Sequence, residues 1–171
     1  CRRLVSAGSI FVIYALTTVL ATQCDQVLIA RFLGPEAVTQ YTIVQRLFQQ
    51  PQVLVMLGLV AQWPAYGEAL GRGDTAWIRR HFRWSLPGYA AFAAVLAGLL
   101  VVFCDPILRL WVGGAVAAPP ALAAAMGLYC VVATVANVFA YFYMSLAIYR
   151  RVLTAQLLLI AITLPLYLLL I

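Results

Sequence analysis

Two ionisable side chains, those of Asp25 and Arg46, lie inside long apolar stretches of the sequence. An ionised group in membrane hydrocarbon costs roughly 2.5–3.5 kcal/mol on insertion scales, so it is kept there only with a partner or a function. The Arg46 guanidinium suits phosphate or carboxylate, and the Asp25 carboxylate suits a proton or a sodium ion. The two groups can equally form a structural salt bridge with each other, and both interpretations stay open at this point.

Rows of other polar side chains follow the same stretches at helical spacing. Thr18 and Thr22 align with Asp25. The next stretch carries polar residues over about half of its helical circumference. They are Thr42, Gln45, Arg46, Gln49, Gln50 and Gln52. A third row, nearer the C-terminus, contains Cys130, Thr134, Asn137, Tyr141 and Ser145. In a membrane, such rows face other helices or a water-filled cavity, where amide side chains bind hydroxyl-rich ligands or hold helices together.

The sequence contains no comparable pattern of residues whose spacing suits enzymatic catalysis. His81 is the only histidine, and no Ser, Cys or carboxylate has a spacing that suggests a catalytic partner for it. The four cysteines are far apart, without the spacing of a zinc site or a disulfide framework. Glycine-rich phosphate loops and paired catalytic carboxylates are absent from the sequence. We therefore expect no catalytic residues, no metal site and no cofactor beyond a coupling proton or sodium ion.

The composition indicates what must position these residues. Of the 171 residues 65% are hydrophobic and only 9% are charged, against about 25% charged in soluble proteins. The sequence therefore predicts an all-α integral membrane protein. Its formal net charge is +6, but the arginines cluster at the ends of apolar runs, which argues against nucleic acid as a partner and for the lipid bilayer.

A helix needs about 20 apolar residues to cross about 30 Å of hydrocarbon. Runs of this kind predict about five transmembrane helices, at 4–33, 35–63, 84–103, 120–149 and 152–171. The Gly34-Pro35 pair separates the first two, and Asp74 is an expected N-cap after the second. The third and fifth helices are nearly all apolar and are expected at the periphery. Pro51 predicts a kink, either static or a hinge.

Arginine positions predict the orientation. With the first helix starting inside, eight arginines lie on the cytoplasmic side, and only Arg31 and Arg109 lie outside, as the positive-inside rule requires. The eight are Arg2, Arg3, Arg72, Arg79, Arg80, Arg83, Arg150 and Arg151. We therefore expect a multi-pass protein whose N-terminal end is cytoplasmic.

Two further segments are expected at the membrane interface, at 74–83 and 105–112. In the first, Arg79, Arg80 and Arg83 share one helical arc, and four apolar residues share the opposite arc. These four are Trp77, Ile78, Phe82 and Trp84. The second segment is too short to span a membrane.

Several blocks resemble polysaccharide biosynthesis proteins of the oligosaccharide-flippase type, within the MATE-like flippase superfamily. The blocks are 25–30, 32–38 with Tyr41, 63–69, 72–74 and 77–80. The most specific read Trp-Pro-Ala-Tyr-Gly-Glu-Ala from Trp63 and Arg-Gly-Asp from Arg72. The chain departs from many relatives at Ser145-Leu146, where they carry Asn-Gly before a basic loop.

The resemblance implies a fragment of the second lobe of a two-lobe transporter, with an N-terminal lobe missing from the sequence. It implies alternating access and translocation of an undecaprenyl-linked oligosaccharide, an O-antigen or exopolysaccharide repeat unit, across the bacterial inner membrane. Arg46 then becomes the candidate for the pyrophosphate, and Asp25, with Thr18 and Thr22, for the coupling cation. The cavity candidates beside Arg46 are Thr42, Gln45, Gln49, Gln52, Asn137 and Tyr141.

Three alternatives compete with this hypothesis. A cation-coupled exporter of drugs or metabolites on the same fold would need Asp25 but not Arg46. A membrane scaffold for envelope assembly would use the polar rows only to hold helices together. An integral-membrane transferase ranks last, because the sequence offers no acid–base or nucleophile constellation.

Overall fold

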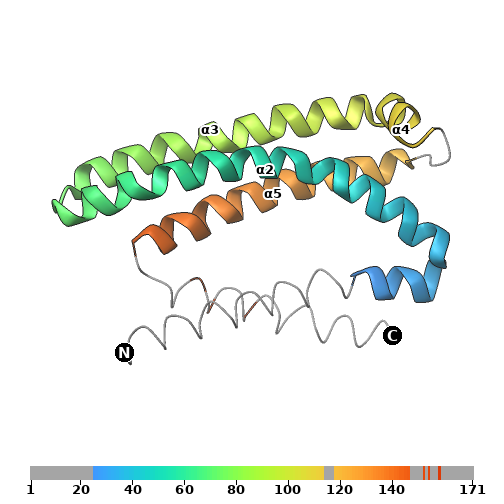
Figure 1. Ribbon diagram of the computed structural model, residues 1–171, viewed down its shortest axis with the longest axis horizontal. Coiled ribbons are helices and arrows are strands. Elements are labelled where there is room, and N and C mark those ends of the chain that lie inside the picture. The colour runs from blue at the N-terminus through green and yellow to red at the C-terminus, as the bar shows by residue number, and fades with distance from the viewer. Residues whose placement is uncertain (1–24, 114–117, 147–151, 153, 155–157, 159–171) are drawn as a thin grey trace. The chain divides into compact units, whose positions relative to one another are not determined.

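The computed structural model describes residues 25–113 and 118–146, with residues 152, 154 and 158. Thr39–Leu146 forms one compact unit, and residues 25–38 belong to a second unit that is described separately. Residues 25–33 are helical, and four helices follow (Figure 1). They are α2 (Pro35–Gly71), α3 (Thr75–Val102), α4 (Cys104–Val112) and α5 (Pro120–Ser145). Every regular element in these described ranges is a helix, as predicted.

Three of these helices, α2, α3 and α5, are long and apolar enough to cross a membrane. The shortest, α5, has 26 residues, and at about 1.5 Å per residue it rises roughly 39 Å. The hydrocarbon layer is about 30 Å thick. The predicted helices at 4–33 and 152–171 lie mostly outside the described residues, so the number of five spans stays a prediction.

The helix bounds differ from the sequence prediction at the first polar turn. Helix α2 does not stop at Trp63 but continues to Gly71, with Pro51 and Pro64 inside it. Helix α3 starts at Thr75, so the segment at 74–83 is continuous with the span predicted at 84–103. Asp74 is the N-cap of α3, as predicted, because its carboxylate accepts a 2.9 Å hydrogen bond from the Trp77 backbone N–H.

Glycines end helices where the sequence predicts breaks. Gly34 has a φ of 86° and precedes Pro35, the first residue of α2. Gly113 has a φ of 69° and ends the short helix α4. The left-handed backbone conformation has little energetic cost for glycine, which lacks a Cβ. The segment predicted at 105–112 is therefore a separate helix, starting at Cys104.

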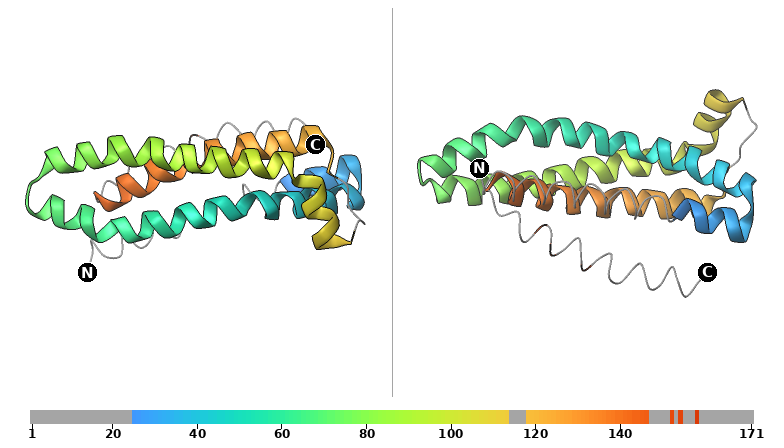
Figure 2. Two further views of the ribbon diagram at one scale, coloured as in Figure 1. Left: turned by 90° about the horizontal axis from the view of Figure 1, so that it is seen from above. Right: turned by 60° about the horizontal axis from the view of Figure 1, so that its bottom comes forward.

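Helices α2, α3 and α5 pack along their lengths (Figures 1 and 2). One face of α2 carries buried residues at helical spacing, among them Val44, Phe48, Val55 and Leu59. Three buried clusters follow each other along this face. The first joins α2 to α3, α4 and α5, and the second centres on Val55, Leu59 and Val138. The third contains Tyr66, Ala69 and Ile78.

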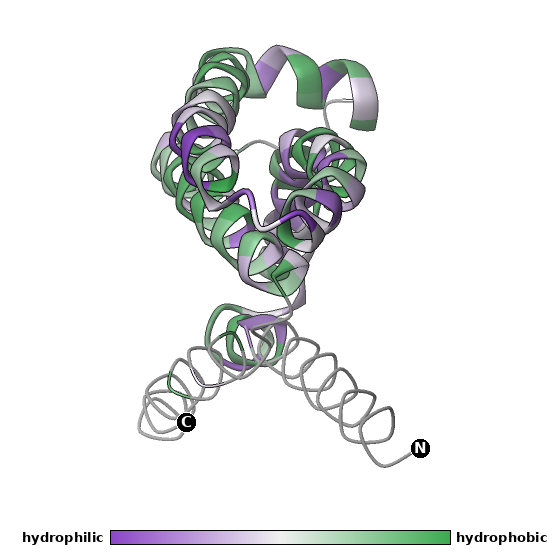
Figure 3. Cartoon of the chain, turned by 90° about the vertical axis from the view of Figure 1, so that its left-hand side faces the viewer, coloured by the Kyte–Doolittle hydropathy of each residue, from purple (hydrophilic) through white to green (hydrophobic). Residues whose placement is uncertain are grey.

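The outer faces of the same helices are apolar as well. Leu57, Val95 and Leu128 are each more than 60% exposed. An exposed surface of this kind suits contact with lipid rather than with water. Hydrophilic residues instead gather at the end of the unit where α2 turns into α3 (Figure 3).

Candidate functional site

The polar row of α2 divides between two faces of that helix. Arg46, Gln49 and Gln50 are exposed, because the opposite face is the one packed against the other helices. The Gln50 side chain donates a 3.1 Å hydrogen bond to the Arg46 carbonyl, so it lies along its own helix. Thr42 and Gln45 are half-buried beside them.

Asp25 was predicted to pair with Arg46 or, together with Thr18 and Thr22, to bind a coupling ion. Asp25 belongs to the separately described unit, and Thr18 and Thr22 lie outside the described residues. The salt bridge between Asp25 and Arg46 and the coupling-ion site therefore both stay predictions.

The polar row of α5 faces the interior of the unit, one of the two environments predicted for it. Cys130 and Thr134 are buried, and the Thr134 hydroxyl donates a 2.8 Å hydrogen bond to the Cys130 carbonyl. Gln52 of α2 is half-buried, and its Nε2 is buried without a hydrogen-bond partner among the described residues. Asn137 is half-buried farther along the same face.

Tyr141 lies far from Arg46 along the unit. Its ring packs edge-on against Trp63, with centroids 5.9 Å apart, and Trp63 is almost five turns beyond Arg46 on α2, or roughly 25 Å. The predicted cavity residues therefore occupy two levels of the described unit rather than one pocket. Their role as ligand contacts stays a prediction.

A polar contact that the sequence analysis missed joins α2 to α3. The Gln62 amide donates a 2.6 Å hydrogen bond to the Tyr89 hydroxyl. Gly58, one turn before Gln62, makes room for this tyrosine, because a Cβ there would lie 2.6 Å from its hydroxyl oxygen. The sequence did contain a signal, a glycine and a glutamine four residues apart on one helical face.

Gln62 and Tyr89 line an open groove of about 540 Å³ between α2 and α3. Its other lining residues are Leu54, Val55, His81, Trp84, Ser85, Gly88 and Phe92. Two buried polar atoms in this lining, Gln62 Oε1 and His81 Nε2, have no hydrogen-bond partner among the described residues. An unsatisfied buried polar atom costs about 1–3 kcal/mol. Because both atoms are buried, they lie behind the surface of the groove rather than on it.

His81 is held by aromatic neighbours on the inward side of α3. Its ring stacks on Trp77 with centroids 4.7 Å apart and planes 7° apart, and it meets Tyr66 edge-on at 5.4 Å. Three residues of the predicted apolar arc, Trp77, Ile78 and Phe82, pack against other helices. The fourth, Trp84, is 77% exposed. Anchoring of Trp84 at the membrane interface stays a prediction.

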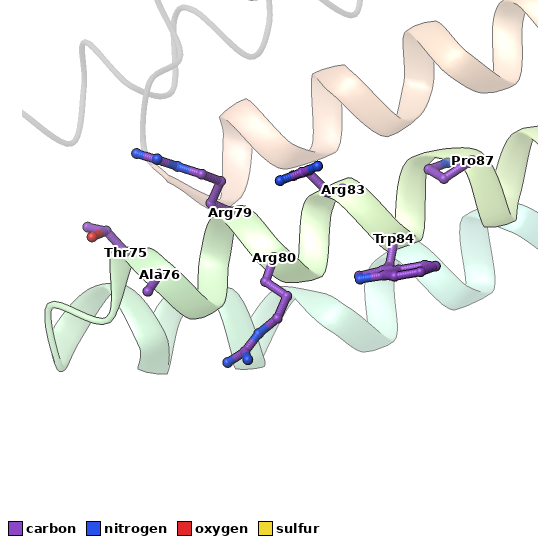
Figure 4. Close-up of a pocket in the computed structure, with 7 residues that line it drawn as sticks. All are labelled: Thr75, Ala76, Arg79, Arg80, Arg83, Trp84 and Pro87. Atoms are coloured by element: carbon purple, nitrogen blue, oxygen red, sulfur yellow. The ribbon is translucent and has the colours of Figure 1, made fainter.

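The outward side of α3 presents three exposed arginines, Arg79, Arg80 and Arg83. Arg80 and Trp84 point to one side of the helix, and Arg79 and Arg83 lie along the other edge (Figure 4). In the part of the chain that the structure describes, none of the three guanidinium groups is paired with a carboxylate. We call the exposed surface of these three arginines the arginine face. It adjoins the groove between α2 and α3 at Trp84.

The Cys104 thiol is poorly suited to act as a nucleophile. Burial raises the pKa of the Cys104 thiol above its ordinary value, and the neighbouring Asp105 carboxylate raises it further. The thiol is therefore protonated at neutral pH, the less reactive form. Among the described residues, no group of three His, Cys, Asp or Glu side chains could hold a metal ion.

No protein-family model, curated protein or solved structure matches this chain. The site is therefore interpreted from its own chemistry.

Proposed function

We propose that this chain is part of a bacterial inner-membrane transporter that moves an undecaprenyl-linked oligosaccharide to the outer leaflet by alternating access. One observation carries the proposal beyond the sequence resemblance. Arg46 and Gln49 are exposed on the outward face of α2, a helix long and apolar enough to cross a membrane.

A polar outward face on such a helix needs a polar partner. Hydrocarbon would not solvate the Arg46 guanidinium or the amides beside it, so this face borders other protein or a water-filled cavity. In the proposed protein, the face lines a cavity between this lobe and the N-terminal lobe. Arg46 binds the pyrophosphate through charge-assisted hydrogen bonds.

The residues one turn from Arg46 suit a glycan. Gln49 is exposed, and Thr42 and Gln45 are half-buried on the neighbouring arc. Their amides and hydroxyl both donate and accept hydrogen bonds, as sugar hydroxyls do. Asp25 would couple transport to a proton or sodium ion.

The test is the chemical identity of what accumulates when the protein is depleted in its host. Mass spectrometry of extracted lipids should then detect one undecaprenyl-pyrophosphate-linked glycan. Restoring the wild-type protein should clear it, whereas Arg46→Ala should leave it accumulated.

Arg109→Ala provides a matched control, because Arg109 is also exposed but belongs to a different helix, α4. It should clear the intermediate as the wild type does. Depletion without such an intermediate, but with altered efflux of small cations, would overturn the proposal in favour of a cation-coupled exporter.

A further inference from the structure

The groove between α2 and α3 continues into the arginine face at a shared residue, Trp84, which lines both. On one side of Trp84 stands the Arg80 guanidinium, one helical turn away (Figure 4). On the other side lie the apolar groove residues Leu54 and Phe92. A positively charged surface, the mouth of the groove, therefore adjoins apolar groove residues. An anionic lipid has the matching arrangement, because its charged phosphate is followed by apolar acyl chains.

The positive charge at this surface has no carboxylate beside it in the described part of the chain. Arg79, Arg80 and Arg83 have no carboxylate partner among the described residues, and the chain as a whole has a formal charge of +6. Basic pockets beside transmembrane helices bind the phosphates of anionic lipids. Tryptophan is enriched at the headgroup level of membranes, where its ring meets both lipid and water.

Two polar side chains, those of His81 and Gln62, belong to the groove lining, and Gln62 holds Tyr89 in the wall through its hydrogen bond. Their unpaired atoms, His81 Nε2 and Gln62 Oε1, are buried. The exposed surface of the groove is therefore suited to apolar contact rather than to further hydrogen bonds.

The length of the groove suits one lipid leaflet. From Arg80 to Phe92 helix α3 rises roughly 18 Å. Half of the membrane hydrocarbon is about 15 Å thick. A lipid with its phosphate at Arg80 would therefore place an acyl chain beside Leu54 and Phe92.

We infer that this surface binds one anionic glycerophospholipid of the bilayer. The phosphate accepts hydrogen bonds from Arg80, and one acyl chain fills the groove between α2 and α3. This lipid is a bound neighbour of the protein, distinct from any transported substrate. Only the insertion of α2 and α3 in a membrane is required.

The test is lipid binding by the purified protein in a neutral detergent, measured by native mass spectrometry. Phosphatidylglycerol, phosphatidylcholine with the same acyl chains, and glycerol 3-phosphate are added in separate titrations. We expect phosphatidylglycerol to bind about tenfold more tightly than phosphatidylcholine, and glycerol 3-phosphate not to bind measurably, because it lacks acyl chains.

Variants locate the site. Arg80→Gln should abolish the preference for phosphatidylglycerol. Gln62→Leu should weaken the binding of both lipids, because it releases Tyr89, which lines the groove. Arg109→Gln, which removes the same charge from α4, should retain the preference. Arg79→Gln, on the other edge of α3, should lose less of it than Arg80→Gln.

Three results would overturn the inference. Equal losses in Arg80→Gln and Arg109→Gln would indicate unspecific attraction to net charge. Glycerol 3-phosphate binding as tightly as phosphatidylglycerol would indicate a site for a soluble phosphate. Equal binding of the two lipids to the wild type would exclude an anion site. These assays report no transport, so their failure leaves the proposed function to its own test.

Discussion

Single residues decide how closely α2 and α3 approach. Tyr89 stands against Gly58, where any larger side chain would meet its ring and hydroxyl. The approach lets Gln62 and Tyr89 form their 2.6 Å hydrogen bond, and it shapes the wall of the groove. A hydrogen bond of this kind contributes about 0.5–1.5 kcal/mol, and its orphaned partners would cost more.

Gly58→Ala should therefore destabilise the protein. The added methyl group would displace Tyr89 and weaken its bond to Gln62, at a cost of about 1–3 kcal/mol. Thermal unfolding in detergent measures the effect. Gly67→Ala is the matched control on the same helix, because nothing lies within 4 Å of its added Cβ. That control should be stabilising by about 0.5–1 kcal/mol, and equal loss in both variants would contradict the close contact.

Cys104 gives a second prediction for a single side chain. It is 4% exposed, and its pKa is raised by burial and by Asp105. The thiolate is the reactive form, so alkylation in the folded protein should be slow at neutral pH. The rate should increase as the pH rises toward the raised pKa. Peptide mapping after maleimide treatment measures it, with Leu110→Cys, at a 91% exposed position, as the fast control. Equal rates at the two positions would be inconsistent with burial.

At the scale of elements, the short turn between α2 and α3 ends the first helix and begins the second. The Asp74 backbone N–H bonds to the Ala69 carbonyl at 2.9 Å, and the Gly73 N–H bonds to Leu70 at 3.1 Å. Gly73 has a φ of 71°. This pattern closes the end of α2. The Asp74 side chain then begins α3 at once.

Asp74→Ala should destabilise the start of α3 by about 1 kcal/mol, because the Trp77 N–H loses its acceptor. Asp74→Asn keeps an acceptor oxygen and should restore most of the loss. Unfolding midpoints of the two variants in the same detergent measure the difference. If Asn were as damaging as Ala, charge rather than capping would be responsible.

At the scale of the whole molecule, the two ends of α3 differ in charge. The turn before α3 and its first turns carry Arg72, Arg79, Arg80 and Arg83, whereas α4 at the other end carries one arginine, Arg109. The positive-inside rule predicts that the first end lies in the cytoplasm. This orientation belongs to the proposed function.

Single cysteines test the orientation in intact cells. Gly71→Cys, at the exposed end of α2, should react only with a membrane-permeant maleimide. Leu110→Cys on α4 should react with an impermeant one, since it would face the outside. The background is a variant whose native cysteines are replaced by serine or alanine. The reverse labelling pattern would mean that the proposed orientation is wrong.

Much of the local structure follows from the sequence. Long apolar runs predict helices because a membrane leaves the backbone no other partner for its hydrogen bonds. Gly34 and Asp74 predict helix ends for local reasons. Glycine adopts the left-handed backbone conformation at little cost, and the aspartate side chain accepts a hydrogen bond from the first turn of the next helix. These features depend on neighbouring residues alone, so the helical class and several helix ends were predictable.

Contacts between helices were not predictable in the same way. The groove forms because Gly58 and Gln62 on α2 lie beside Tyr89 on α3. The spacing of residues within one helix does not reveal how two helices are aligned with each other. Likewise, Trp77 packs against other helices whereas Trp84, on the same predicted arc, is 77% exposed. Sequence alone determined which segments are helical and apolar. Only the tertiary structure decided which polar atoms meet, because side-chain packing between distant segments selects one register among many of similar hydropathy.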